Sequence, residues 1–238
     1  MKNGTLYGIG VGPGDPELIT LKAINILRRV AVVFAAASTK NSHSLAEKIV
    51  SPHLKEGVPV VPLGFPMTRD KKMLAGAWRE NARKVVETLK KEEDAAFITL
   101  GDPMIYSTFG YIMRTIKETD PDIPIEIIPG ITSYQAGAAA AGQSLVEAEE
   151  SYAVISGALG SQKLKDIIDH TDSVVMLKVY HNYKEILDTL NQLDLTAGSV
   201  LISRCGLDGE KILTDVKKLR DKDPPYLSLL IIKKNNKG

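Results

Sequence analysis

The stretch FITLGDPMIYST, residues 97–108, decides the fold class of this chain. A short apolar run leads directly into Gly101-Asp102-Pro103, and a Tyr-Ser-Thr cluster follows. A second apolar run enters a glycine-bearing segment, PGITSYQAGAAAAG, at residues 129–142. Two strands that exit into such loops can enclose one small polar ligand, because open α/β sheets bind ligands at the carboxyl ends of their parallel strands.

Strand and helix patterns alternate along the rest of the chain. Apolar runs predict strands over 5–11, 30–36, 58–63, 95–100, 125–130, 152–158, 173–180, 199–206 and 225–233. Helical spacing predicts helices after residue 15, over 42–50, up to about residue 91, and over 107–119, 132–142, 161–170 and 183–193. The alternation predicts an α/β protein with a parallel sheet in its first half. Little helix separates the last two strands, which favours a mixed sheet in the second half.

The segment TDPDIP, residues 119–124, is the predicted linker because it carries two prolines. We therefore expect two α/β domains, 1–120 and 121–238. The first helix is expected to begin at Asp15 as its N-cap, with Pro16 in the first turn. Its predicted buried face consists of Leu18, Leu21, Ile24 and Leu27.

Composition narrows the class of protein. The 238 residues carry a net charge of +1, which does not support sequence-independent electrostatic binding to nucleic acid or anionic lipid. The single cysteine, Cys205, excludes an intramolecular disulfide. No signal peptide is visible, and no stretch approaches the roughly 20 apolar residues that span a bilayer. We expect a cytoplasmic protein with no membrane and no nucleic-acid partner.

The segment GIGVGPGDP, residues 8–16, invites a dinucleotide-binding interpretation. The G-x-G-x-x-G pattern fails from Gly8 and from Gly10, because the sixth position is then Pro13 or Asp15. Two interpretations remain: a tight strand-to-helix turn, or bare backbone that lies against a bulky ligand. The later Gly101-Asp102-Pro103 repeats the same local pattern. Asp102 is either a second capping residue or a residue that faces the ligand, and the pattern leaves both open.

Several catalytic patterns are missing from the sequence. The four histidines have no metal-ligand spacing, and there is no Cys-x-x-Cys, no G-x-S-x-G and no phosphate-binding G-x-x-x-x-G-K-[ST]. Cys205 is expected to be a small buried apolar group, and Trp78 is expected to pack in the core. We expect no metal site. The absence of these motifs is compatible with a transferase that acts mainly by holding two ligands in register.

Five motifs in order, across nearly the whole chain, resemble the tetrapyrrole (corrin/porphyrin) methylases, which use S-adenosylmethionine as methyl donor. They are GIGVGPGDPELITLKA, FITLGDPMIYST, IPGITSYQAGAAAAG, VMLKVY and SRCGLDGE. Within that family, PLGFPMTRDKKMLAGAW and YSTFGYI resemble enzymes of cobalamin biosynthesis that methylate C-20 of precorrin-2 or cobalt-factor II. The resemblance implies a homodimer of two-domain subunits, with the active site in a cleft between the domains and S-adenosylhomocysteine as a product.

The resemblance also implies site residues by motif position. Those expected to bind the cofactor are Gly101, Asp102, Pro103, Ile105, Tyr106, Ser107, Thr108, Ile131, Thr132, Ser133, Met176, Lys178, Cys205 and Leu227. Those expected to border the tetrapyrrole are Gly12, Pro13, Gly14 and Asp15. The role of Cys205 is less defined, because relatives often carry a Gly-Arg-x-x-Thr/Ser stretch where this chain reads SRCG.

The tetrapyrrole substrates of the family carry eight carboxylates, so cations in a loop are candidate partners. Arg69 is the predicted substrate-binding residue, and the loop cations Lys40, Lys71 and Lys72 are further candidates. The alternative interpretation is that these cations belong to a solvated charged surface. Asp15, His43 and Tyr106 are open candidates for the proton acceptor. Other acceptors also stay open: another ring position, uroporphyrinogen III, diphthamide or ribosomal RNA. A dinucleotide-linked oxidoreductase and a catalytically inactive binding module are the alternatives from other classes.

Overall fold

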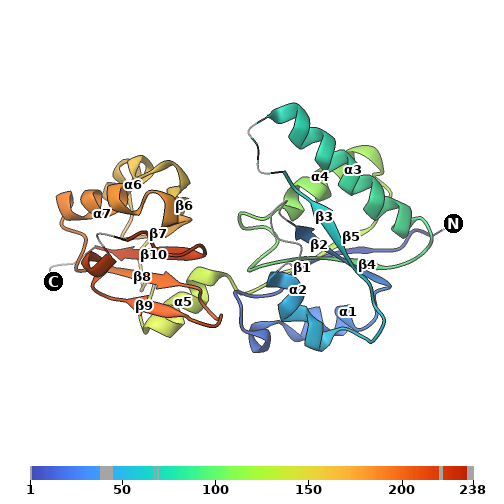
Figure 1. The fold of residues 1–238 in the computed structure, drawn as a ribbon, viewed down its shortest axis with the longest axis horizontal. Coiled ribbons are helices and arrows are strands. Elements are labelled where there is room, and N and C mark those ends of the chain that lie inside the picture. Colours follow the sequence, from blue (N-terminus) through green and yellow to red (C-terminus); the bar gives the residue numbers. More distant parts are fainter. Residues whose placement is uncertain (1, 38–44, 67, 69, 220–221, 235–238) are drawn as a thin grey trace. The chain divides into compact units, whose positions relative to one another are not determined.

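The computed structural model describes residues 2–37, 45–66, 68, 70–219 and 222–234. The chain forms two compact units, Met1–Thr132 and Ser133–Gly238, and each is described by itself (Figure 1). Both units contain a five-stranded sheet, which confirms the α/β class. Among the described residues, no helix is long and apolar enough to cross a membrane.

The first unit is a parallel sheet with the strand order β3-β2-β4-β1-β5. Its strands are β1 (Leu6–Gly10), β2 (Val32–Ala37), β3 (Val60–Gly64), β4 (Ala95–Thr99) and β5 (Ile125–Ile128). Its helices are α1 (Leu21–Leu27), α2 (Leu45–Val50), α3 (Lys71–Leu89) and α4 (Phe109–Thr119). Because β4, β1 and β5 are neighbours, their carboxyl ends meet at one edge of the sheet.

Helices cover both faces of this sheet: α1 and α2 lie on one face and α3 and α4 on the other (Figure 1). The buried strand β4 supplies both faces in alternation. Ala96 and Ile98 pack with α1 and α2, whereas Ala95 and Phe97 pack with α3 and α4. Burial on both sides explains why β4 reads as a continuous apolar run.

The first helix differs from its prediction. Asp15 caps only a single 3₁₀ turn, Pro16–Leu18, and α1 begins after a second cap, Thr20, whose hydroxyl accepts a hydrogen bond from the Ala23 N–H at 3.2 Å. This restart rotates the buried face to Ala23, Ile26 and Leu27. Leu21, predicted to be buried, is 79% exposed. The sequence carries two capping signals five residues apart, and spacing alone did not separate them.

The second unit is a mixed sheet with the strand order β6-β7-β10-β8-β9. Its strands are β6 (Tyr152–Ser156), β7 (Ser173–Leu177), β8 (Ser199–Ser203), β9 (Lys211–Leu213) and β10 (Ser228–Lys233). Its helices are α5 (Ser133–Ala141), α6 (Gln162–Ile167) and α7 (Tyr183–Gln192). Strand β10 runs antiparallel to β7 and to β8, which confirms the predicted mixed sheet. The short edge strand β9 was not predicted.

Two hydrophobic layers sandwich the second sheet. Side chains of α6 and α7, such as Leu164 and Ile186, pack on one face with Met176. Tyr134 and Ala138 of α5 pack on the other face, with Val175. The small side chains of α5 let this helix lie close to the sheet, because a Cβ on Gly137 would already touch Ile202 at 3.5 Å.

The boundary between the units lies later than the sequence suggests. The proline-rich segment 119–124 leads into β5, which pairs in parallel with β1 and so belongs to the first sheet. The first unit therefore extends to Thr132 rather than ending at residue 120. Two prolines marked a turn between a helix and a strand of one sheet, because turns inside a domain use the same residues as linkers between domains.

Candidate functional site

Three glycines meet at the carboxyl edge of the first sheet, where β1, β4 and β5 end. We call Gly10, Gly101 and Gly130 the glycine junction. A Cβ on Gly10 would lie 2.5 Å from the Gly101 carbonyl oxygen and 2.7 Å from the Gly130 nitrogen. A Cβ on Gly130 would overlap the same carbonyl oxygen and lie 2.8 Å from the Gly10 Cα atom. The three backbones are in contact, so a side chain fits neither at Gly10 nor at Gly130.

Backbone hydrogen bonds fix the loops that leave this junction. The Gly101 N–H donates to the Gly12 carbonyl at 2.8 Å, and the Gly12 N–H donates to the Gly101 carbonyl at 3.4 Å. Both glycines have positive φ angles, +83° at Gly12 and +66° at Gly101, which other residues rarely adopt. The 12–15 loop is thus held against the 101–108 loop.

The glycines of the first loop serve packing inside the unit. A Cβ on Gly8 would overlap the ring of Phe109, which is fully buried at the start of α4. Pro13 and Gly14 are also buried, and Asp15 accepts a hydrogen bond from the Glu17 N–H at 2.8 Å. These contacts favour the tight-turn interpretation for Gly8 and Gly10, because protein atoms already occupy the space beside them.

Asp102 joins the two loops that the sequence singled out. One of its carboxylate oxygens, Oδ1, accepts a hydrogen bond from the Met104 N–H at 2.8 Å. The other, Oδ2, accepts one from the Gly130 N–H at 3.1 Å. The carboxylate is therefore a cap within its own loop and also a tie to the loop that follows β5.

The segment after Asp102 presents apolar side chains outward. Met104, Ile105 and Tyr106 are 52%, 40% and 54% exposed, and Tyr106 has a left-handed φ of +50°. The Ser107 hydroxyl donates to the Thr99 hydroxyl at 3.1 Å and accepts from the Phe109 N–H at 3.1 Å. The edge thus combines bare backbone and hydroxyl groups with an exposed apolar strip, a mixture that suits a ligand with polar and apolar parts.

The remaining first-unit residues of the predicted site also lie in these loops. Pro103 and Thr132 are buried, whereas Thr108 and Ile131 are half-buried. Ser133, which was also predicted for the site, is the first residue of α5 and belongs to the second unit. The glycine junction adds Gly10 and Gly130, and the exposed apolar strip adds Met104, to the residues that the sequence predicted for the site. A usable signal was present, since a glycine stands at or just after the end of each of the three neighbouring strands.

In the second unit, three predicted residues lie at one edge of the sheet. Lys178 follows β7, Cys205 follows β8 and Leu227 precedes the antiparallel β10, so the register brings them to the same side. The Arg204 N–H donates to the Leu227 carbonyl at 3.0 Å, beside a hydrogen bond of 2.8 Å between the Ser203 and Ser228 hydroxyls. Lys178, Arg204 and Leu227 all have positive φ angles. Residues in sparsely populated backbone conformations cluster at functional sites, so this end of the second sheet is a candidate site.

Met176, the fourth predicted residue of this unit, has no exposed surface and packs in the core between β7 and helices α6 and α7. The structure thus gives Met176 a packing role. Arg69, the predicted substrate-binding residue, lies outside the described residues, as do Lys40 and His43. Trp78 is half-buried and stacks on Tyr111, with ring centroids 4.4 Å apart.

Cys205 is a buried thiol rather than a reactive one. It is 6% exposed, and burial, followed by the nearby Glu210 carboxylate, raises its pKa to about 11. We expect iodoacetamide to alkylate the folded protein slowly until the pH approaches 11, because the thiolate is the reactive form. Urea-unfolded protein should titrate near the ordinary value of about 8.5. The contribution of this thiol to stability is complete below that value and is lost as the pH rises toward 11.

The labelling rate, followed by mass spectrometry of the intact protein, checks this prediction. A midpoint near 8.5 in the folded protein would contradict it.

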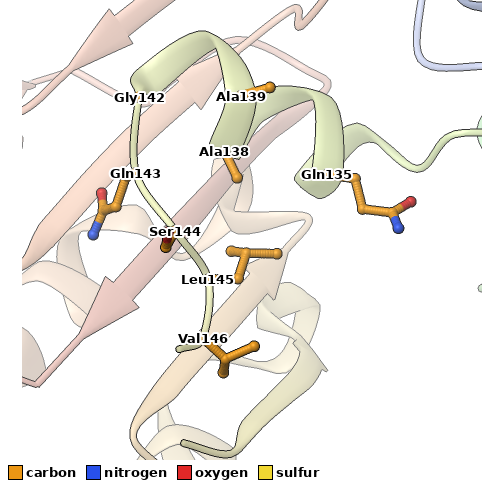
Figure 2. Close-up of a pocket in the computed structure, with 8 residues that line it drawn as sticks. All are labelled: Gln135, Ala138, Ala139, Gly142, Gln143, Ser144, Leu145 and Val146. Carbon is orange, nitrogen blue, oxygen red and sulfur yellow. The ribbon is translucent and has the colours of Figure 1, made fainter. Parts of the chain in front are cut away.

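A shallow cavity of about 470 Å³ lies elsewhere in the second unit (Figure 2). Its lining comes from α5 and the loop after it: Gln135, Ala138, Ala139, Gly142, Gln143, Ser144, Leu145 and Val146. None of these residues belongs to the predicted site. In the part of the chain that the structure describes, no group of three or more His, Cys, Asp or Glu side chains can hold a metal ion.

The fold and the glycine junction define a class of protein. This is an α/β protein in which the carboxyl ends of the central parallel strands form an edge made largely of backbone, the position at which open α/β sheets bind ligands. Residues 5–220 match the family described as Tetrapyrrole (Corrin/Porphyrin) Methylases. The chain belongs to this family of methyltransferases.

Relatives and solved structures agree with this assignment. A Methanocaldococcus jannaschii protein named probable cobalt-precorrin-2 C(20)-methyltransferase is 35% identical over 233 residues, covering 96% of each chain. The Salmonella typhimurium cobalt-precorrin-2 C(20)-methyltransferase is 34% identical, covering 98% of this chain and 97% of the relative. A Thermus thermophilus uroporphyrin-III C-methyltransferase, solved in complex with S-adenyl homocysteine, shares the fold with a TM-score of 0.71 at 22% identity, covering 97% of this chain and 98% of that one.

Proposed function

We propose that this protein transfers a methyl group from S-adenosylmethionine to C-20 of a precorrin-2-type tetrapyrrole in cobalamin biosynthesis. The observation that carries the proposal is the similarity, over nearly the full length and at 34–35% identity, to two proteins named for this reaction. The glycine junction supports it, because it leaves backbone accessible to a ligand at the end of the sheet. We favour the cobalt-loaded substrate. Both of these relatives are named for cobalt-precorrin-2, whereas a Sinorhizobium protein named precorrin-2 C(20)-methyltransferase is 28% identical.

The first-unit edge fits S-adenosylmethionine in chemical character. Bare backbone at Gly101 and the half-buried hydroxyls of Ser107 and Thr108 suit the polar groups of the donor. The exposed side chains of Ile105 and Tyr106 suit its apolar surface. We propose that these residues, with the backbone of Asp102 and with Pro103, Ile131, Thr132 and Ser133, contact the donor. Lys178, Cys205 and Leu227 of the second unit are also proposed to contact it. When bound, the donor supplies a methyl group that its sulfonium has already activated.

The protein then acts mainly by positioning. Effective molarities in well-oriented reactions are worth about 7–11 kcal/mol, so holding the two ligands in register and excluding water can account for much of the rate. We propose that the 12–15 loop borders the tetrapyrrole, because backbone hydrogen bonds join it to the donor loop at Gly101. Arg69 remains a proposed partner for a substrate carboxylate. The proposal includes a homodimer, as the resemblance implies, and a cytoplasmic location, as the composition favours.

The deciding experiment is an anaerobic incubation with S-adenosylmethionine, offering cobalt-precorrin-2 and metal-free precorrin-2 in parallel. We expect a gain of one methyl group by mass spectrometry, placed at C-20 by NMR, with faster conversion of the cobalt-loaded substrate. Conversion of the metal-free substrate alone would reverse the metal preference. A methyl group at another ring position would contradict the C-20 assignment.

A further inference from the structure

Two Gly-Asp-Pro segments in the first unit differ in what the aspartate does. At Asp15 and at Asp102, the Oδ1 atom accepts a hydrogen bond from the N–H two residues later, at 2.8 Å in both cases. This is the ordinary local turn of aspartate before proline. Asp102 also uses its Oδ2 atom to accept the Gly130 N–H at 3.1 Å, across 28 residues of sequence. The second bond ties the end of β4 to the end of β5.

We propose that Asp102 is a positioning residue, which locks the 129–132 turn onto the 101–108 loop and so forms the donor surface before any ligand binds. This inference rests on the proposed function, because the surface in question is the proposed S-adenosylmethionine site. It replaces the expectation that the Asp102 carboxylate itself binds the donor. Each carboxylate oxygen already accepts a backbone N–H, and charged acceptors make the stronger kind of hydrogen bond.

The location of this tie explains why it matters. Gly130 is a member of the glycine junction, and its neighbours Ile131 and Thr132 are proposed to face the donor. Strand β5 is an edge strand of the sheet, so its carboxyl end has a neighbouring strand, β1, on one side only. The Asp102 carboxylate adds a tie from the loop that follows β4, the strand on the far side of β1. Its bond to Gly130 thus adds a tie to the turn after β5 that the pairing of β5 with β1 does not supply.

Asp102→Asn is the informative substitution. The amide keeps one oxygen acceptor but turns an NH₂ group toward the other backbone N–H, so one of the two hydrogen bonds is lost. We expect faster hydrogen exchange at the Gly130 amide in the ligand-free protein. We also expect about tenfold weaker binding of S-adenosylhomocysteine by calorimetry, since hydrogen bonds to charged groups carry free energies of this order. The KM for S-adenosylmethionine should rise by a similar factor, with a smaller change in kcat.

Asp94→Asn is the matched control. The Asp94 Oδ1 atom accepts the Thr5 N–H at 2.7 Å, so it ties the starts of β4 and β1 at the opposite, amino edge of the same sheet. We expect Asp94→Asn to lower stability to a similar degree while leaving S-adenosylhomocysteine binding unchanged. Equal loss of binding in both variants would overturn the proposal, because the effect would then be one of general stability.

The exchange measurement separates the two roles of Asp102. Unchanged exchange at Gly130 in ligand-free Asp102→Asn, together with weaker ligand binding, would mean that the carboxylate contacts the donor directly and would overturn the positioning role. If the unmodified protein binds no S-adenosylhomocysteine, the proposed function fails, and the exchange result alone then decides whether Asp102 locks the turn.

Discussion

Gly130→Ala is expected to unfold the carboxyl edge of the first sheet. The added methyl group would overlap the Gly101 carbonyl oxygen and lie 2.7 Å from the Gly10 carbonyl carbon, and both of these are backbone atoms that cannot rotate away. Overpacking of a tight core costs about 1–3 kcal/mol and occasionally more. Because three strand ends must separate to admit one methyl group, we expect a loss at the upper end of that range, with loss of S-adenosylhomocysteine binding.

Urea unfolding followed by fluorescence measures this effect directly. Trp78 is the only tryptophan and lies on α3, so its emission reports the first unit. Gly76→Ala, two residues earlier on the same helix, is the matched control. No atom lies within 4 Å of a Cβ at Gly76, so alanine should stabilise the helix by about 0.5–1 kcal/mol. An equal stability for Gly130→Ala and the parent protein would show that the junction tolerates side chains.

Phe109→Ala should destabilise the first unit by about 3–5 kcal/mol. The ring of Phe109 is fully buried, lies 5.6 Å from the ring of Phe97 between centroids, and fills the space where Gly8 has no side chain. Its removal leaves a cavity directly beneath β1, the central strand of the glycine junction. The same fluorescence-detected urea titration gives the loss in the free energy of unfolding.

A double-mutant cycle tests whether the Phe109 ring is the reason that position 8 requires glycine. Gly8→Ala alone should destabilise the protein, because its methyl group overlaps the Phe109 ring. In the presence of Phe109→Ala, the same methyl group enters the cavity. We expect a favourable coupling of about 0.5–3 kcal/mol, as contacting residues show. Additive losses would mean that Gly8 is required for another reason, such as the approach of a ligand.

The sequence predicted much of the fold because its signals were local. Strand β4 is apolar at every position from Ala95 to Ile98 and is buried on both faces, as predicted. The mixed second sheet followed from the short connection before β10, and the structure confirms it. The position of the domain boundary depended instead on whether β5 pairs with β1. That pairing joins residues far apart in the chain, and no local pattern near residue 120 reports it.

In the site, too, some features follow from local sequence and others from the pairing of distant strands. Local pattern identified the loops at 101–108 and 129–132 and suggested that Asp102 caps its own loop, which its bond to Met104 confirms. The second bond, to Gly130, depends on strand order, because β4 and β5 flank β1 in space. The contact between the Gly10 and Gly130 backbones depends on the same order. The sequence marks these backbone contacts only by the glycines at the strand ends, and which backbones touch depends on the strand order.

The place of β5 also has a consequence for synthesis of the chain. Residues 1–120 contain four strands of the first sheet, and until 125–128 leave the ribosome the outer side of β1 has no partner strand. Unpaired strand edges invite association with other chains. The 129–132 turn follows β5 directly, so a nascent chain completes the first sheet and the first-unit part of its proposed donor surface together. A translational pause before residue 125 would therefore expose β1 at its most vulnerable stage.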